Sequence, residues 1–140
     1  MFEVDEIPVL ARKMNYDILN NGIGGDIFLK EHLTPMPEFK PDIIFVAYGT
    51  NDWASNTPDA PENIKEYFKE LRELYGNTEI NVILTIWRKD INDKPELLFT
   101  FAEIREMIKK SAEDIGATVI DGFNFVPEPE LLWWDGYLHP

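Results

Sequence analysis

Two kinds of hydrophobic pattern alternate along the chain, one continuous and one spaced at every third or fourth residue. Continuous apolar runs predict strands covered on both faces, and they lie at residues 42–48, 80–87 and 117–121. Helical spacing predicts three helices, at residues 7–14, 61–75 and 97–115. In the second of these helices Pro61 suits the first turn and Gly76 ends it.

Weaker signals fill the segments between these elements. Residues 16–20 predict a short strand, residues 21–26 a Gly-rich turn, and residues 27–33 one or two helical turns. Polar loops are expected at residues 49–60 and 88–95, and an irregular segment follows residue 121.

The alternation of strands and helices predicts a single α/β domain over residues 1–140, built on a parallel sheet. Ligands of such sheets bind outside the carboxyl ends of the strands. Polar residues follow three of the predicted strands, at residues 22–26, 49–53 and 87–88. We therefore expect them to share one rim of the sheet.

Composition excludes several classes of function. The 140 residues include 26 acidic and 13 basic side chains, which give a net charge of −13, and there is no Cys. The charge disfavours nucleic acid and anionic membrane surfaces as partners. Without Cys, a disulfide scaffold, a thiolate zinc site and a Cys nucleophile are excluded. No apolar run can span a bilayer and residues 2–6 are no signal peptide, so a cytoplasmic location is expected if Met1 is the natural start.

Three short motifs could carry chemistry at the predicted rim. The glycines at residues 21–26 have two explanations. Either they allow the positive φ of a tight turn, or they let a backbone N–H come close to a ligand oxygen. Asn51 ends a strand, so it either closes a polar turn or donates its amide to a developing oxyanion. Near the end of the chain, Asp135 could orient the ring of His139 as a base.

The order of these motifs resembles the SGNH hydrolases, also called the GDSL lipase/esterase family. That family carries a Gly-Asp-Ser block, a Gly block, a Gly-x-Asn-Asp block and an Asp-x-x-His block. By this resemblance Gly25 and Asn51 would be oxyanion donors, and His139 and Asp135 the catalytic base and its partner. The last block departs in spacing, because three residues rather than two separate Asp135 from His139.

The resemblance implies a three-layer, flavodoxin-like parallel sheet flanked by helices. Relative to the family, the first central strand with its Gly-Asp-Ser block and the closing helix are missing, so both ends look clipped. Three arrangements are open: the chain is a piece of a longer enzyme, residues 16–20 pair directly with residues 42–48, or another chain supplies the strand. An exposed strand edge would favour self-association into a homo-oligomer.

The nucleophile is therefore absent from the expected place. The only serines are Ser55, in the predicted loop after Asn51, and Ser111, in a predicted helix. Ser55 is not on the strand-to-helix turn that presents a hydroxyl to a His. We expect this 140-residue chain to be inactive by itself.

The leading interpretation is a carboxyl-ester hydrolase with a Ser-His-Asp mechanism and no metal or cofactor. The expected substrates are short acyl esters, such as acetyl groups on sugars, with Trp53, Arg88 and Trp134 as candidate substrate contacts. For the tryptophans the alternative is ordinary packing, and for Arg88 a solvated surface role. The alternative function is a non-catalytic module of the same fold that binds a ligand or partner.

A metal hydrolase is a third hypothesis. Its possible ligands are scattered without motif spacing, at His32, Asp26, Asp52 and His139. The sequence therefore gives no metal site.

Overall fold

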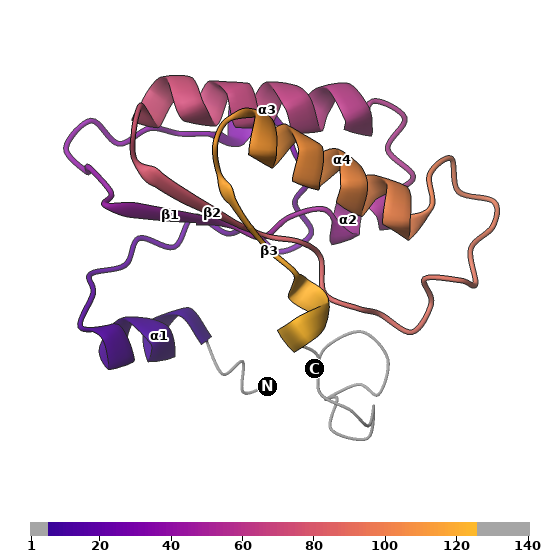
Figure 1. The fold of residues 1–140 in the computed structure, drawn as a ribbon, viewed down its shortest axis with the longest axis horizontal. Helices are drawn as coiled ribbons and strands as arrows, with labels where there is room; N and C mark the ends of the chain where they lie inside the picture. The colour runs from indigo at the N-terminus through magenta and orange to yellow at the C-terminus, as the bar shows by residue number, and fades with distance from the viewer. Residues whose placement is uncertain (1–5, 126–140) are drawn as a thin grey trace.

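The computed structural model describes residues 6–125, which form three strands, four α-helices and two short 3-10 helices (Figure 1). In chain order these are α1 (Glu6–Met14), η1 (Lys30–His32), β1 (Ile43–Val46), α2 (Thr50–Ala54), α3 (Ala60–Tyr75), β2 (Glu79–Ile83), α4 (Phe101–Asp114), β3 (Thr118–Ile120) and η2 (Gly122–Phe125).

The three strands form a parallel sheet in the order β1-β2-β3. Its register pairs Val46 with Val82 and Val82 with Val119. The strands are shorter than the apolar runs that predict them, but the parallel α/β architecture is as expected.

Helices α3 and α4 cover one face of this sheet, and α1 lies on the opposite side (Figure 1). The core between sheet and helices is formed by residues that are almost fully buried: Val46, Ile80 and Val82 from the strands, Ile64, Phe68 and Leu71 from α3, and Ile104, Ile108 and Ala112 from α4. The apolar stripes that predict the two long helices are therefore the surfaces that they bury.

The second face of the sheet is more open than the sequence predicts. Phe45 is 53% exposed, and Thr118 on β3 is also exposed. The expectation that residues 42–48 are covered on both faces is wrong at Phe45, because no described helix packs over this side chain. A continuously apolar run does not itself provide the layer that would cover it.

Residues 16–20 do not form the predicted strand. Their apolar side chains Tyr16, Ile18 and Leu19 are exposed, and the one backbone hydrogen bond in this stretch runs from the Tyr16 N–H back to the Ala11 carbonyl. A strand needs a neighbour to complete its hydrogen bonds, and this stretch has none within residues 6–125. Direct pairing with residues 42–48 is thus ruled out there, and β1 is an edge strand of the described sheet. Self-association through that edge stays a prediction.

Two helix boundaries also differ from the prediction. Residues 50–54 form α2 where a loop was expected, and α4 begins at Phe101 rather than near residue 97. The reason at α4 is a capping box: the Thr100 hydroxyl accepts from the Glu103 N–H, and the Glu103 carboxylate accepts from the Thr100 N–H.

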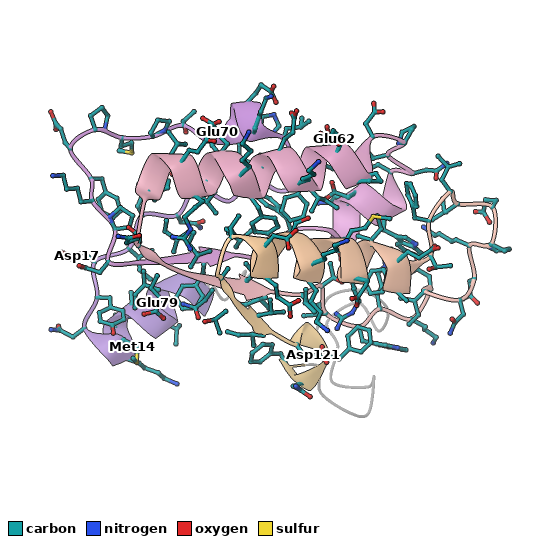
Figure 2. All side chains as sticks on the ribbon, turned by 45° about the horizontal axis from the view of Figure 1, so that its top comes forward. Met14, Asp17, Glu62, Glu70, Glu79 and Asp121 are labelled. Carbon is teal, nitrogen blue, oxygen red and sulfur yellow. The ribbon has the colours of Figure 1, made fainter. Side chains whose placement is uncertain are left out.

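Acidic side chains lie at the surface of the molecule. Glu62, Glu79 and Asp121, which are labelled in Figure 2, are all exposed. Within residues 6–125, no helix combines the length and the apolar character that crossing a bilayer requires.

Candidate functional site

Two of the predicted motifs meet in the structure. The side-chain amide of Asn51 donates a hydrogen bond of 2.9 Å to the backbone carbonyl of Asp26, the residue directly after Gly25. Gly25 has a φ of +83° and is exposed, and within residues 6–125 its N–H donates no hydrogen bond. The predicted oxyanion donors therefore lie on neighbouring segments, and the Gly25 N–H is free to bind a ligand.

Gly49 sets the position of Asn51 at the start of α2. Gly49 has a φ of +116°, and a Cβ there would lie 2.4 Å from Ile108 Cδ1 and 2.9 Å from Thr85 Cγ2. Only glycine fits this turn at the end of β1. The Gly49 carbonyl also accepts from the Trp53 N–H, which fixes the first turn of α2.

The Asp26 carboxylate connects three parts of the chain. It accepts from the Ile27 N–H at 2.9 Å and from the Tyr48 hydroxyl at 3.1 Å, and its Oδ1 lies 2.8 Å from His32 Nδ1. Burial, together with the charge of Asp26, raises the pKa of the Tyr48 hydroxyl to about 12. Tyr48 therefore stays a hydrogen-bond donor throughout the physiological pH range.

Asp52 ties the following segment to α2. Its Oδ1 accepts from the Phe28 N–H at 3.0 Å, whereas the buried Oδ2 has no hydrogen-bond partner among residues 6–125. Phe28 is fully buried against the rings of Tyr48 and Tyr67. Burial raises the pKa of the Asp52 carboxyl above its ordinary value of 3.8, the Phe28 N–H opposes this rise, and the charge of Asp26 adds to it.

Trp53 and Arg88, the predicted substrate contacts, lie in the interior. Arg88 is 4% exposed, and its guanidinium donates to both carboxylate oxygens of Asp90, at 2.6 and 2.8 Å. Trp53 is 2% exposed, with Arg88 Cζ 4.8 Å from its ring centroid and the ring of Phe101 at 5.1 Å. A solvated role for Arg88 is therefore wrong, and substrate contact by either residue stays a prediction.

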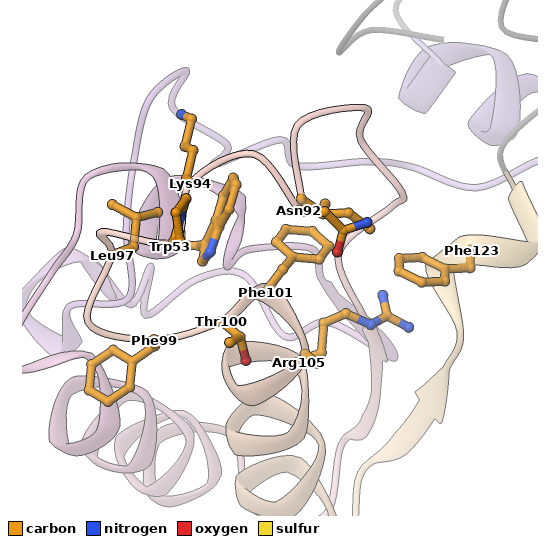
Figure 3. A pocket seen from close by; sticks show the side chains of 12 residues that line it. Trp53, Asn92, Lys94, Leu97, Phe99, Thr100, Phe101, Arg105 and Phe123 are labelled. Carbon is orange, nitrogen blue, oxygen red and sulfur yellow. The ribbon is translucent and has the colours of Figure 1, made fainter.

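A hollow of about 390 Å³ opens beside Trp53 (Figure 3). Its wall is mostly apolar and includes Phe101 and Phe123, and Lys94 and Arg105 stand at its edges. Both cations have acidic partners, because Lys94 pairs with Asp90 and Arg105 with Asp121.

Three predicted site residues, His139, Asp135 and Trp134, lie outside the described residues, so their roles stay predictions. Ser55 follows α2 at an exposed position, and Ser111 lies within α4. No group of three potential metal ligands occurs within residues 6–125.

Sequence reasoning missed two acidic partners at or near the site. No sequence motif predicts the pairing of Asp26 with His32, because this contact depends on how η1 packs. A local signal did exist for Asp90, which lies two residues after Arg88 in a segment assigned to a polar loop.

Comparisons with known proteins give the family and the fold of the chain. A family model described as the GDSL-like Lipase/Acylhydrolase family matches residues 8–140. The uncharacterized lipoprotein YqeF of Bacillus subtilis (strain 168) is 40% identical over 63 residues, which are 43% of this chain and 26% of that protein.

Two solved structures share the fold. The salicylyl-acyltransferase SsfX3 from a tetracycline biosynthetic pathway has a TM-score of 0.58 and 24% identity, and the match covers 74% of this chain and 33% of that one. A second solved structure has a TM-score of 0.58 and 16% identity, and the match covers 70% of this chain and 56% of the other. The chain thus matches less than two thirds of the length of each of these proteins. Because the family model spans nearly all of it, the chain belongs to the GDSL-like lipase/acylhydrolase family.

Proposed function

We propose that this chain supplies the oxyanion donors and the His-Asp pair of a carboxyl-ester hydrolase. The observation that carries the proposal is the convergence of two motifs, in which Asn51 bonds to the carbonyl of Asp26 beside the free N–H of Gly25. An Asn amide has two N–H donors. Within residues 6–125, one of those of Asn51 is hydrogen-bonded, to the Asp26 carbonyl. The second N–H and the Gly25 N–H are available to an oxyanion.

The mechanism follows from these donors. A serine hydroxyl attacks the ester carbonyl while His139, oriented by Asp135, takes the hydroxyl proton. The carbonyl oxygen becomes an oxyanion that Asn51 and Gly25 stabilise. His139 then gives its proton to the leaving alcohol, and water releases the acid from the serine by the same steps. Transfer of the acyl group to a second alcohol instead of water would use the same site.

The nucleophile is assigned to a serine outside these 140 residues. Ser111 lies in the middle of α4, and Ser55 follows the short helix α2 rather than a strand-to-helix turn. Neither position gives the presentation that a serine nucleophile requires. The family model supports an acylhydrolase type of reaction.

Short acyl esters, including acetyl groups on sugars, remain the preferred substrates. The support from Trp53 is reduced by its burial, because a ring that is 2% exposed presents little surface on which a sugar could stack. Trp134 is the remaining predicted aromatic contact. Long acyl chains are disfavoured because the sequence shows no apolar lid segment.

The test compares the 140-residue chain with the protein encoded by its complete reading frame. The assay measures hydrolysis of 4-nitrophenyl acetate and of acetylated xylose, together with covalent labelling by a fluorophosphonate. We expect hydrolysis and labelling of a serine in the complete protein and neither in the 140-residue chain. His139-dependent hydrolysis by the 140-residue chain would contradict the assignment of the nucleophile. Absence of any reactive serine in the complete protein would favour the non-catalytic binding module.

A further inference from the structure

The turn that carries Gly25 has little packing of its own. Ile23 is 66% exposed, and a Cβ at Gly24 or Gly25 would meet no atom within 4 Å. Asp26 is the first anchored residue after this turn, with its carboxylate almost buried. The contacts that fix Asp26 therefore also fix the position of the N–H of the preceding residue, Gly25.

We propose that His32 is a positioning residue that acts through Asp26 on both oxyanion donors. His32 Nδ1 lies 2.8 Å from Asp26 Oδ1. The backbone carbonyl of Asp26 orients Asn51, and its backbone N–H closes the turn onto the Ile23 carbonyl at 3.2 Å. A rotation of Asp26 would displace both donors at once. The inference rests on the proposed function for its catalytic consequence, but not for the contacts.

His32 itself is held by the body of the protein. The neighbouring Lys30 pairs with Glu66 on α3 at 2.8 Å, and Leu33 packs against the core. The His32 N–H also donates to the Leu29 carbonyl at 3.0 Å. Element η1 is therefore a fixed support from which the imidazole reaches Asp26.

The contact requires a donor at Nδ1 and not a base at Nε2. A carboxylate oxygen accepts hydrogen bonds, and an imidazole can donate one to it from Nδ1. An Asn side chain offers an N–H donor at the place of Nδ1 but cannot act as a base.

The first test needs no catalysis. In the ¹⁵N-labelled 140-residue chain, NMR measures the Gly25 amide position and the solvent exchange of the Asn51 side-chain N–H. We expect His32→Ala to shift the Gly25 signal and to speed Asn51 exchange about tenfold or more, because the variant removes an anchor of Asp26. His32→Asn should restore both signals, and Lys69→Met, which removes an exposed pair with Glu73 on α3, should leave them nearly unchanged.

The second test measures kcat and KM in the protein of the complete reading frame. We expect His32→Ala to lower kcat about tenfold with little change in KM, and His32→Asn to stay within about threefold of the wild type. If His32→Ala fails to fold, Tyr48→Phe, which removes the bond to the other Asp26 oxygen, should produce the same NMR changes in weaker form.

The outcomes separate the two proposals. Wild-type NMR signals in His32→Ala, or a His32→Asn variant as impaired as His32→Ala, would overturn the positioning role. The expected NMR changes in a complete protein that hydrolyses no ester would overturn the proposed function and leave the positioning role standing.

Discussion

The Asn51 side chain and the Asp26 backbone carbonyl are joined by a 2.9 Å hydrogen bond across 25 positions of sequence. This bond connects the start of α2, which follows β1, to the Gly-rich turn that precedes η1. It fixes the orientation of the Asn51 amide before any ligand is bound. A donor that is already oriented costs no reorganisation when charge develops on a substrate, which is the condition for effective oxyanion stabilisation.

Asp52 should make stability depend on pH. Because burial raises its folded pKa above the unfolded value of about 3.8, the folded state binds the proton more tightly. Its contribution to the free energy of unfolding is therefore present at low pH and lost as pH rises from about 3.8 through the folded pKa. We expect Asp52→Asn to gain stability relative to the wild type across this window, as measured by urea unfolding from pH 3 to 7.

Asp121 provides a control of opposite sign. The Phe123 N–H and the Arg105 guanidinium lower the pKa of this carboxyl. The contribution of Asp121 to the free energy of unfolding is present above its unfolded pKa and is lost as pH falls through its folded pKa. Asp121→Asn should therefore be less stable than the wild type at neutral pH. A stability difference between Asp52→Asn and the wild type that does not change with pH would contradict the role given to Asp52.

Gly49→Ala should destabilise the fold and displace α2. The new Cβ would meet Ile108 and Thr85 in addition to the unfavourable φ of +116°. We expect a loss of about 2–4 kcal/mol in the free energy of unfolding. Gly116→Ala is the matched control, because Gly116 also has a positive φ but has open space around it, and it should cost about 1 kcal/mol. Equal costs for the two variants would show that packing at Gly49 is unimportant.

Arg88→Met should be strongly destabilising. It removes the bidentate partner of the buried Asp90 carboxylate, which also pairs with Lys94 at 3.3 Å. We expect a loss of about 3 kcal/mol, seen as a lower urea midpoint and little affected by salt. Lys69→Met removes an exposed pair with Glu73 and should cost less than about 0.5 kcal/mol. A loss for Arg88→Met as small as that for Lys69→Met would refute a structural role for the buried pair.

Helix α3 could be predicted almost to the residue. Its apolar stripe, Pro61 and Gly76 are all local signals, and the observed helix is Ala60–Tyr75. The start of α4 had an equally local signal, since Thr100 and Glu103 form a capping box, and the longer apolar pattern before it obscured that signal. The predicted strand at residues 16–20 failed because a strand depends on a partner that local sequence does not reveal.

The candidate site also has features with a sequence signal and features that depend on how distant segments pack. Motif order predicted that Gly25 and Asn51 would lie together, whereas the rule that strand ends share a rim does not account for Gly25, because residues 16–20 form no strand. The bonds from Tyr48 and His32 to Asp26 depend on how η1 packs against α3 and were not predictable from spacing. Arg88 was expected at the surface because a polar loop usually is, but its bidentate pair with Asp90 allows burial.

The measurement that tests the central claim most directly is the kcat of Asn51→Ala for hydrolysis of a short acyl ester by the protein of the complete reading frame. Loss of one oxyanion donor should lower kcat by about 10² to 10³-fold with little change in KM, and loss of its bond to the Asp26 carbonyl should lower the thermal midpoint only slightly. His139→Ala, assayed in parallel, reports loss of the predicted base. A kcat for Asn51→Ala within about threefold of the wild type would contradict the assignment of Asn51 as an oxyanion donor.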